Sequence, residues 1–353
     1  MKKLIIAIAT LFITMFASSM VVYAGSEELK QDAQGVYWYY NNGVKDTTKS
    51  GMVEYDGGLF VIIDGKLRTD FNGMCLVPGV EKWYFFSQGQ VQKDWIGFAE
   101  YNGAWFYLDE GELDSTKTGI YEYDGGYFLL AEGRLIKEYS GLYQNTKGEN
   151  KDNKWYYFSN GQYQVYTGIA SYDKAFFYLF NGCLADDVNG AVEYDNAYFN
   201  ISNGMVTGTA TSQDVIRNPL SQTKSAITEL SVYNAMISLE DEYPEGMEWT
   251  NDNYYRWKGG IYSGGYGCAG FAFRLSDEAF GSLRATKHTD VNNIKVGDIL
   301  RVNDNTHSVI VLEVSDDRIV IAEGNYNYSI HWGRTMTRTQ LENNCDYVMT
   351  RWP

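Results

Sequence analysis

The chain has 353 residues and carries 29 basic and 45 acidic side chains, a formal net charge of −16. This balance argues against nucleic acid as a partner, because phosphate contacts need a basic face, and 44% hydrophobic residues argue against a disordered chain. The 17 Phe, 9 Trp, 30 Tyr and 36 Gly instead indicate many short strands joined by tight turns.

Residues 1–24 have the pattern of a secretory signal peptide. Lys2 and Lys3 precede an apolar run over 4–22, and Ala24 provides the small residue at the expected cleavage site. We expect cleavage after Ala24. The alternative is an uncleaved anchor, since about 19 apolar residues could just span a bilayer. The expected product is a secreted or cell-wall-associated protein without membrane contact.

A repeat with a period of about 22 residues fills residues 25–208. About eight aromatic segments, such as AWFYLDEG ending at Gly111 and KWYYFSNG ending at Gly161, close on a glycine, and a second glycine follows in the first seven units. Two glycines in register indicate two turns, since glycine adopts positive φ without steric cost. Each unit is therefore predicted to be a β-hairpin. One hairpin cannot bury its aromatic face alone, so we predict an all-β solenoid of stacked hairpins.

The W-Y-Y-F-x-x-G units resemble the cell-wall-binding repeats of choline-binding and glucan-binding proteins of Gram-positive bacteria. In the choline-binding relatives, aromatic side chains from successive repeats hold a quaternary ammonium by cation–π attraction. The units depart from that pattern at the Trp that commonly follows the second glycine, which is replaced by Met52, Met74, Phe98, Ile120, Leu142, Ile169 and Ala191. The resemblance therefore implies peptidoglycan or another wall glycan or polymer as the ligand, rather than choline.

The composition changes after the repeats. Residues 209–222 are polar and contain a proline, and we expect them to form a linker. Residues 223–242 place apolar side chains at helical spacing before Pro244 and Gly246, which predicts a helix. The chain from 223 to 353 is then long enough for one compact α+β domain.

Cysteine usage is sparse for an exported protein. The four cysteines are too scattered for a disulfide framework, although one or two pairs remain possible. They are Cys75, Cys183, Cys268 and Cys345. Neither a CxxC nor an HExxH pattern occurs, so we expect no metal and no cofactor.

Only Cys268 lies in a segment that is built around it. Five glycines between 259 and 267 precede it, and Ala269–Phe280 can form a helix. A cysteine at a helix N-terminus lies near the positive end of the helix dipole, which favours the thiolate, the nucleophilic form. The alternative is a buried structural cysteine.

His307 is the expected base among three histidines, because it opens the alternating apolar strand HSVIVLEV. The following apolar strand ends in a polar pair, Glu323 and Asn325, which would share one face of an extended chain with Ile319 and Ile321. Such a side chain can reach a histidine on the adjacent strand and orient its ring, as a Cys–His catalyst needs. Taken singly, the histidine could cap a strand end and the asparagine could be a turn residue.

These segments resemble two related families. YRWKGG at 255–260 followed by CAGF at 268–271 is similar to the Y-x-W-G-G…D-C-S-G-[FLV] signature of NlpC/P60 cysteine peptidases, with the lysine as an apparent insertion and Gly267 in place of Asp. The GD…H-S-V segment and Glu323-x-Asn325 resemble the CHAP amidase/endopeptidase domains. Both families belong to the papain-like cysteine peptidases, whose members commonly cleave peptidoglycan stem peptides or cross-bridges.

The resemblance implies Cys268 as nucleophile, His307 as general base and Asn325 as the group that orients the imidazole, with Glu323 as its rival or helper. It also implies that the Tyr255 hydroxyl contributes to the oxyanion site, together with the backbone N–H of Cys268.

We therefore expect a multidomain protein, with a β-hairpin solenoid followed by a papain-like α+β domain. Its expected function is that of a wall-associated cysteine hydrolase cleaving peptidoglycan amide bonds, as an endopeptidase or an N-acetylmuramoyl-L-alanine amidase. The alternatives are a binding or adhesion protein with an inert papain-like domain, and a cysteine peptidase acting on a protein substrate.

Overall fold

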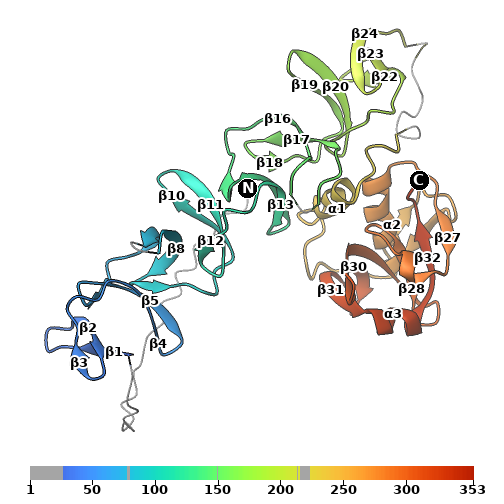
Figure 1. Cartoon of the computed structure of the whole chain (residues 1–353). Coiled ribbons are helices and arrows are strands. Elements are labelled where there is room, and N and C mark those ends of the chain that lie inside the picture. The colour runs from blue at the N-terminus through green and yellow to red at the C-terminus, as the bar shows by residue number, and fades with distance from the viewer. Residues whose placement is uncertain (1–26, 78–79, 149, 213, 215–222) are drawn as a thin grey trace. The chain divides into compact units, whose positions relative to one another are not determined.

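The computed structural model describes residues 27–353 except 78–79, 149, 213 and 215–222 (Figure 1). The predicted signal peptide and most of the predicted linker lie outside these residues. Contacts divide the chain into two compact units, one that runs to Trp95 and includes Asp109–Glu112, and one that consists of Ile96–Leu108 and Leu113–Pro353. In the described part of the chain, no helix is long and apolar enough to cross a membrane.

The repeats form antiparallel β-hairpins, which confirms the prediction made from the paired glycines. Most units contribute two long strands and one short strand. The early strands are β1 (Glu27–Gln31), β2 (Tyr37–Asn41), β3 (Val44–Lys45), β4 (Gly51–Tyr55), β5 (Gly58–Ile63), β6 (Lys66–Leu67), β7 (Gly73–Val77), β8 (Lys82–Ser87), β9 (Gln90–Val91), β10 (Gly97–Tyr101), β11 (Ala104–Asp109) and β12 (Glu112–Leu113). The later ones are β13 (Gly119–Tyr123), β14 (Gly126–Ala131), β15 (Arg134–Leu135), β16 (Gly141–Gln144), β17 (Trp155–Ser159), β18 (Gln162–Tyr163), β19 (Gly168–Tyr172), β20 (Ala175–Phe180), β21 (Cys183–Leu184), β22 (Gly190–Tyr194), β23 (Ala197–Ser202) and β24 (Met205–Thr209).

The glycine that ends each aromatic segment joins one repeat to the next. The Gly133 carbonyl accepts from the Tyr107 N–H (2.7 Å), and the Gly133 N–H donates to the Lys117 carbonyl (2.8 Å). A Cβ on Gly133 would lie 2.5 Å from the Asp114 carbonyl oxygen, so only glycine permits this approach. Corresponding bonds occur at Gly65, Gly89, Gly111, Gly161, Gly182 and Gly204. The repeat glycine therefore forms part of the turn and also allows adjacent repeats to pack closely.

The C-terminal part of the second unit contains a six-stranded antiparallel sheet in the order β27-β32-β28-β29-β30-β31, coloured orange and red in Figure 1. Its elements are α1 (Glu229–Ile237), β25 (Tyr254–Arg256), β26 (Gly264–Tyr266), α2 (Gly267–Phe280), β27 (Thr286–His288), the 3₁₀ helix η2 (Val291–Asn293), β28 (Ile299–Val302), β29 (His307–Val314), β30 (Arg318–Tyr326), β31 (Ser329–Thr337), α3 (Arg338–Asn344) and β32 (Cys345–Thr350). The expected α+β composition is observed.

The sheet has two buried faces. On one face, Phe271 and Leu275 of α2 pack in the same cluster as Ile310 of β29. On the other, strand residues including Val309 pack with Leu341 of α3. Consecutive strand residues thus alternate between two cores, which accounts for the nearly continuous apolar runs in β29 and β30.

The first helix is shorter than the helical spacing over 223–242 predicts. Thr228 accepts a hydrogen bond from the Ser231 N–H (3.1 Å), and the Ser231 hydroxyl oxygen accepts one from the Thr228 N–H (2.9 Å). This capping box begins α1 at Glu229.

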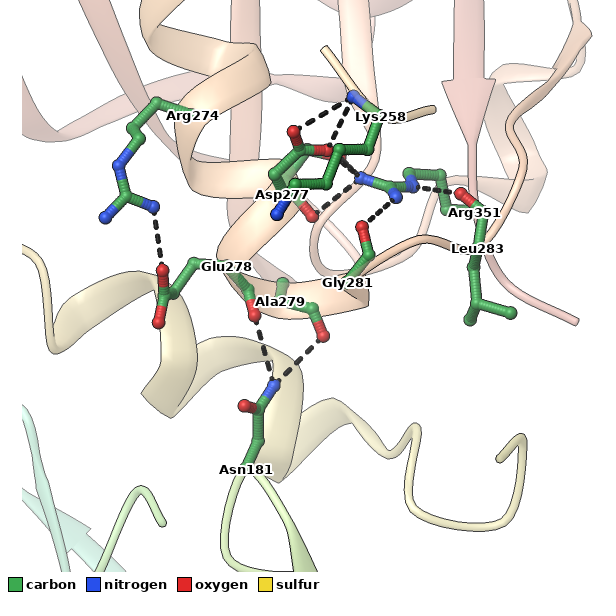
Figure 2. A network of polar contacts seen from close by, with 10 residues as sticks. Asn181, Lys258, Arg274, Asp277, Glu278, Ala279, Gly281, Leu283 and Arg351 are labelled. Carbon is green, nitrogen blue, oxygen red and sulfur yellow. Dashed lines mark hydrogen bonds and ion pairs between the residues drawn. The ribbon is translucent and has the colours of Figure 1, made fainter. Parts of the chain in front are cut away.

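The C-terminal end of α2 is held by a buried polar network (Figure 2). Arg351 pairs with Asp277 (Nη1 to Oδ1, 2.7 Å) and also donates to the carbonyls of Ser276 and Gly281. Asn181 of the repeats donates from Nδ2 to the Ala279 carbonyl (3.0 Å). The Ala279 carbonyl is among those that a helix C-terminus leaves without an intrahelical partner, and the Gly281 carbonyl belongs to the residue that caps α2.

Candidate active site

Cys268 is the second residue of α2, and its side chain is almost buried. The preceding residue, Gly267, has a φ of +54°, and a Cβ there would lie 2.5 Å from Asn251 Oδ1 and 2.9 Å from Asn325 Nδ2. A side chain at this position would crowd both amide groups, and Gly267 avoids that contact. Because the first-turn N–H groups of a helix have no intrahelical partners, the Cys268 N–H can donate to a substrate oxyanion.

His307, the first residue of β29, lies between Cys268 and Glu323. Its Nε2 is 2.7 Å from Oε2 of Glu323, whose side chain is fully buried, and its ring also hydrogen-bonds with the Cys268 thiol. With Nε2 engaged by the carboxylate, Nδ1 is the nitrogen left for the sulfur. Arg334 of β31 donates to both oxygens of Glu323, with Nη2 2.9 Å from Oε2. Glu323 is thus held in place by a cation on its other side.

These contacts favour a thiolate beside an imidazolium. Burial alone would raise the pKa of Cys268, but the hydrogen bond and charge of His307 outweigh it, and the pKa of Cys268 is lowered. Burial alone would lower the pKa of His307, but Cys268 and Glu323 raise it to about 9. For Glu323, hydrogen bonds from His307 and Arg334 overcome burial and lower the pKa of its carboxyl. The contacts therefore lower the pKa of the thiol and raise that of the imidazole.

Asn325 does not share a face with Glu323, contrary to the expectation for a regular strand. The β30–β31 ladder shifts register between Glu323 and Tyr326, and Asn325 has a φ of 56°. Its Nδ2 donates to Oδ1 of Asn251 (2.8 Å). The bulge places the Asn325 amide beside Gly267, whereas the carboxylate that contacts His307 comes from Glu323.

Tyr255, in β25, is directed to another partner. Its hydroxyl hydrogen-bonds with Asp277, and burial together with that carboxylate raises the pKa of Tyr255 to about 12. Among the described residues, no hydrogen bond joins the Tyr255 hydroxyl to Cys268. The structure therefore brings together Cys268, His307 and Glu323 but not Tyr255.

A pocket of about 280 Å³ lies beside the nucleophile. Ala269 and Ser308, which follow Cys268 and His307 in the chain, both line it, together with Arg301 and Tyr347. The sequence patterns did not identify Arg301 as a pocket residue. Its basic side chain stands among the apolar residues of the strand ILRV, and such an interruption could have marked it.

A second pocket, of about 310 Å³, lies among repeat hairpins of the second unit. Its lining includes Trp105, Arg134, Lys137, Glu138 and Asn160. One indole ring with charged and amide side chains suits a sugar or another polar polymer unit better than a quaternary ammonium, which needs a cage of several rings.

All four cysteines lie in the described part and are free thiols. No cluster of His, Cys, Asp and Glu able to hold a metal ion occurs among the residues that the structure describes.

Comparisons with known proteins find likenesses only among solved structures. No family model matches the chain, and no curated protein matches it significantly. Among solved structures it is similar to CbpF in complex with ipratropium, at 19% identity and a TM-score of 0.26, covering 48% of this chain and 62% of that one. It is also similar to alternansucrase in complex with isomaltotriose, at 14% identity and a TM-score of 0.21, covering 60% of this chain and 19% of that one.

A third similar structure is the modular autolysin LytC from Streptococcus pneumoniae in complex with a synthetic peptidoglycan ligand, at 13% identity and a TM-score of 0.14, covering 51% of this chain and 52% of that one. The chain thus spans less than two thirds of each of these three proteins.

Proposed function

We propose that this protein is a secreted, cell-wall-associated cysteine hydrolase that cleaves an amide bond of peptidoglycan, as an endopeptidase or an N-acetylmuramoyl-L-alanine amidase. The observation that carries the proposal is the chain of contacts from Cys268 through His307 to the buried Glu323. The helix packed on an antiparallel sheet agrees with the papain-like fold that the sequence motifs imply.

The residues suffice for acyl transfer without a redox step. The Cys268 thiolate attacks the amide carbonyl carbon, and the Cys268 backbone N–H stabilises the oxyanion. Protonated His307 gives its proton to the leaving nitrogen as the C–N bond breaks, which leaves a thioester. Neutral His307 then takes a proton from water, whose oxygen attacks the thioester and releases the carboxylic acid and the thiolate. Glu323 keeps the imidazole oriented in both steps.

The repeats supply the attachment in this proposal. Residues 25–208 carry 14 basic and 26 acidic side chains, which disfavours a polyanion as their ligand. The Trp105 pocket offers one stacking surface with polar neighbours, as a glycan needs. Several such weak contacts would keep the hydrolase at a high effective concentration on its polymer.

Digestion of purified Gram-positive peptidoglycan, followed by mass spectrometry of the soluble products, tests the proposal. We expect the protein to release defined fragments, whose masses identify the bond, and the Cys268→Ala variant to release none. Cys345→Ala is the matched control, because Cys345 lies in the same fold and its thiol donates to the Tyr347 carbonyl (3.7 Å) rather than contacting His307.

If neither the wild type nor Cys268→Ala releases fragments from walls of several chemotypes, and both still co-sediment with these walls, a binding or adhesion protein would be favoured instead. If the protein cleaves a protein substrate but not peptidoglycan, the alternative of a cysteine peptidase that acts on proteins would be favoured.

A further inference from the structure

One residue, Ser308, connects Arg301 to the nucleophile. Its backbone N–H donates to the Cys268 sulfur, and its hydroxyl oxygen accepts a hydrogen bond from Arg301 Nη1 (2.9 Å). Arg301 and Cys268 are thus joined through this single residue, and the charge of Arg301 helps to lower the pKa of the thiol.

The guanidinium is held by the chain and still has donors to spare. Asn305 accepts from Nε (2.9 Å, to Oδ1) and from Nη2 (2.5 Å, to its carbonyl oxygen). Together with Ser308, these bonds use three of the five N–H groups of Arg301. One N–H on each terminal nitrogen remains, and that pair matches the two oxygens of a carboxylate.

A second cation lies near the pocket. Lys287 Nζ is 4.1 Å from the centroid of the Tyr347 ring and donates to the hydroxyl of Tyr262, and both of these aromatic residues line the pocket. Within the described residues, neither Lys287 nor Arg301 forms an ion pair. The neighbouring acid, Asp346, accepts the backbone N–H of Asn305 (2.7 Å). A chain of net charge −16 thus keeps two cations without carboxylate partners beside this pocket.

We propose that the pocket lined by Arg301, Ala269 and Ser308 is an anion subsite that receives a free carboxylate of the substrate, next to the scissile amide. The inference rests on the proposed function and narrows its substrate class to peptides whose carboxylate close to the cleaved bond is not amidated. Tyr262, Phe273 and Tyr347 would pack against the carbon chain that carries this carboxylate and shield the ion pair from water. Arg301 is the specificity-determining residue.

Two alkylating reagents test the subsite without any hydrolysis. Iodoacetate carries a carboxylate, and iodoacetamide carries a neutral amide in its place. With either reagent the thiolate forms a bond to carbon and iodide leaves. The ratio of the two rate constants at Cys268, followed by peptide mass spectrometry, therefore cancels any change in the reactivity of the sulfur and reports on the carboxylate.

We expect Arg301→Gln to lower the iodoacetate-to-iodoacetamide ratio about tenfold, the effect of one charge-assisted hydrogen bond. Arg301→Lys should keep most of the ratio because it keeps the positive charge. If Arg301 were merely structural, Arg301→Gln and Arg301→Lys would have the same effect. Lys287→Gln should lower the ratio less. Arg318→Gln, an exposed position at the start of β30, is the control and should change nothing.

An equal ratio in the wild type and in a folded Arg301→Gln variant would overturn the anion subsite. If Arg301→Gln does not fold, an unchanged ratio in Lys287→Gln at low salt, together with no response of the wild-type ratio to added chloride, would overturn it in the same way.

The substrate arm compares native peptidoglycan with peptidoglycan whose carboxyl groups have been amidated by carbodiimide and ammonia. We expect the wild type to digest the native polymer about tenfold faster, and Arg301→Gln to remove that preference. Equal digestion of both polymers by the wild type would overturn the inference. If the wild type digests neither polymer, the proposed function is overturned but the anion subsite is not, because the alkylation ratio tests the subsite independently.

Discussion

Glu323 Oε2 lies 2.7 Å from His307 Nε2, and the Glu323 side chain is fully buried. Asn325, two residues further along the same strand, bonds to Asn251 instead. The carboxylate therefore has the geometry to hold one imidazole tautomer and to stabilise the imidazolium, while the amide belongs to the loop in front of the nucleophile.

The first prediction separates these two residues. Glu323→Gln should lower the hydrolysis rate by roughly 10²–10⁴-fold, because the amide that replaces the carboxylate cannot stabilise the imidazolium. Asn325→Ala should cost about tenfold or less, because it removes only the bond to Asn251. Turnover of one soluble wall peptide measures both variants. Arg334→Gln controls for the lost cation contact, and an equal loss in Asn325→Ala and Glu323→Gln would contradict the assignment.

The second prediction concerns pH. Because the pKa of Cys268 is lowered, the rate of its alkylation by iodoacetamide should reach its plateau at a lower pH than that of an ordinary thiol, and fall as the pH drops and the thiolate is protonated. Hydrolysis should also fall as the pH rises through about 9, because His307 then loses the proton that the leaving amine needs. Alkylation needs no such proton and should stay fast there.

His307→Ala provides the matched test of this pH profile. It removes the contact that lowers the pKa of Cys268 and leaves the burial that raises it, so the alkylation midpoint should move to higher pH. An unchanged midpoint in this variant would show that His307 does not activate the thiol.

The third prediction uses two glycines of the same fold. Gly267→Ala should lose about 1–2 kcal/mol for its positive φ, more for the collision with Asn251 and Asn325, and most of its activity. Gly333→Ala carries a similar backbone cost, since φ is +81°, but no atom lies within 4 Å of its new Cβ. Urea unfolding of both variants isolates the cost of the collision, and equal losses of stability and activity would refute it.

The fourth prediction concerns the buried ion pair of Figure 2. Arg351→Ala should destabilise the fold by about 3–5 kcal/mol, because Asp277 is left buried without its cation. The exposed pair Arg134 and Glu138 is the comparison, and Arg134→Ala should cost about 1 kcal/mol or less. Chemical unfolding measures both, and similar losses would contradict the importance of burial.

Much of this protein is determined by its sequence alone. The hairpins follow from glycines in register and from alternating aromatic residues, because turn conformation and strand alternation are encoded in short stretches of chain. The strand that begins at His307 and the helix that follows Cys268 are likewise encoded in short stretches of the sequence. Both elements were predictable without knowledge of the rest of the chain.

The tertiary structure decided which side chains meet. Glu323 and Asn325 are equivalent in a regular strand, and only the register shift against β31 separates them. The repeat glycine Gly133 needs its lack of a side chain because the backbone of the adjacent segment at Asp114 lies against it. Arg301 reaches Ser308, which also contacts Cys268, only because β28 pairs with β29 at this position. Such contacts depend on packing between segments far apart in the chain, which no local pattern encodes.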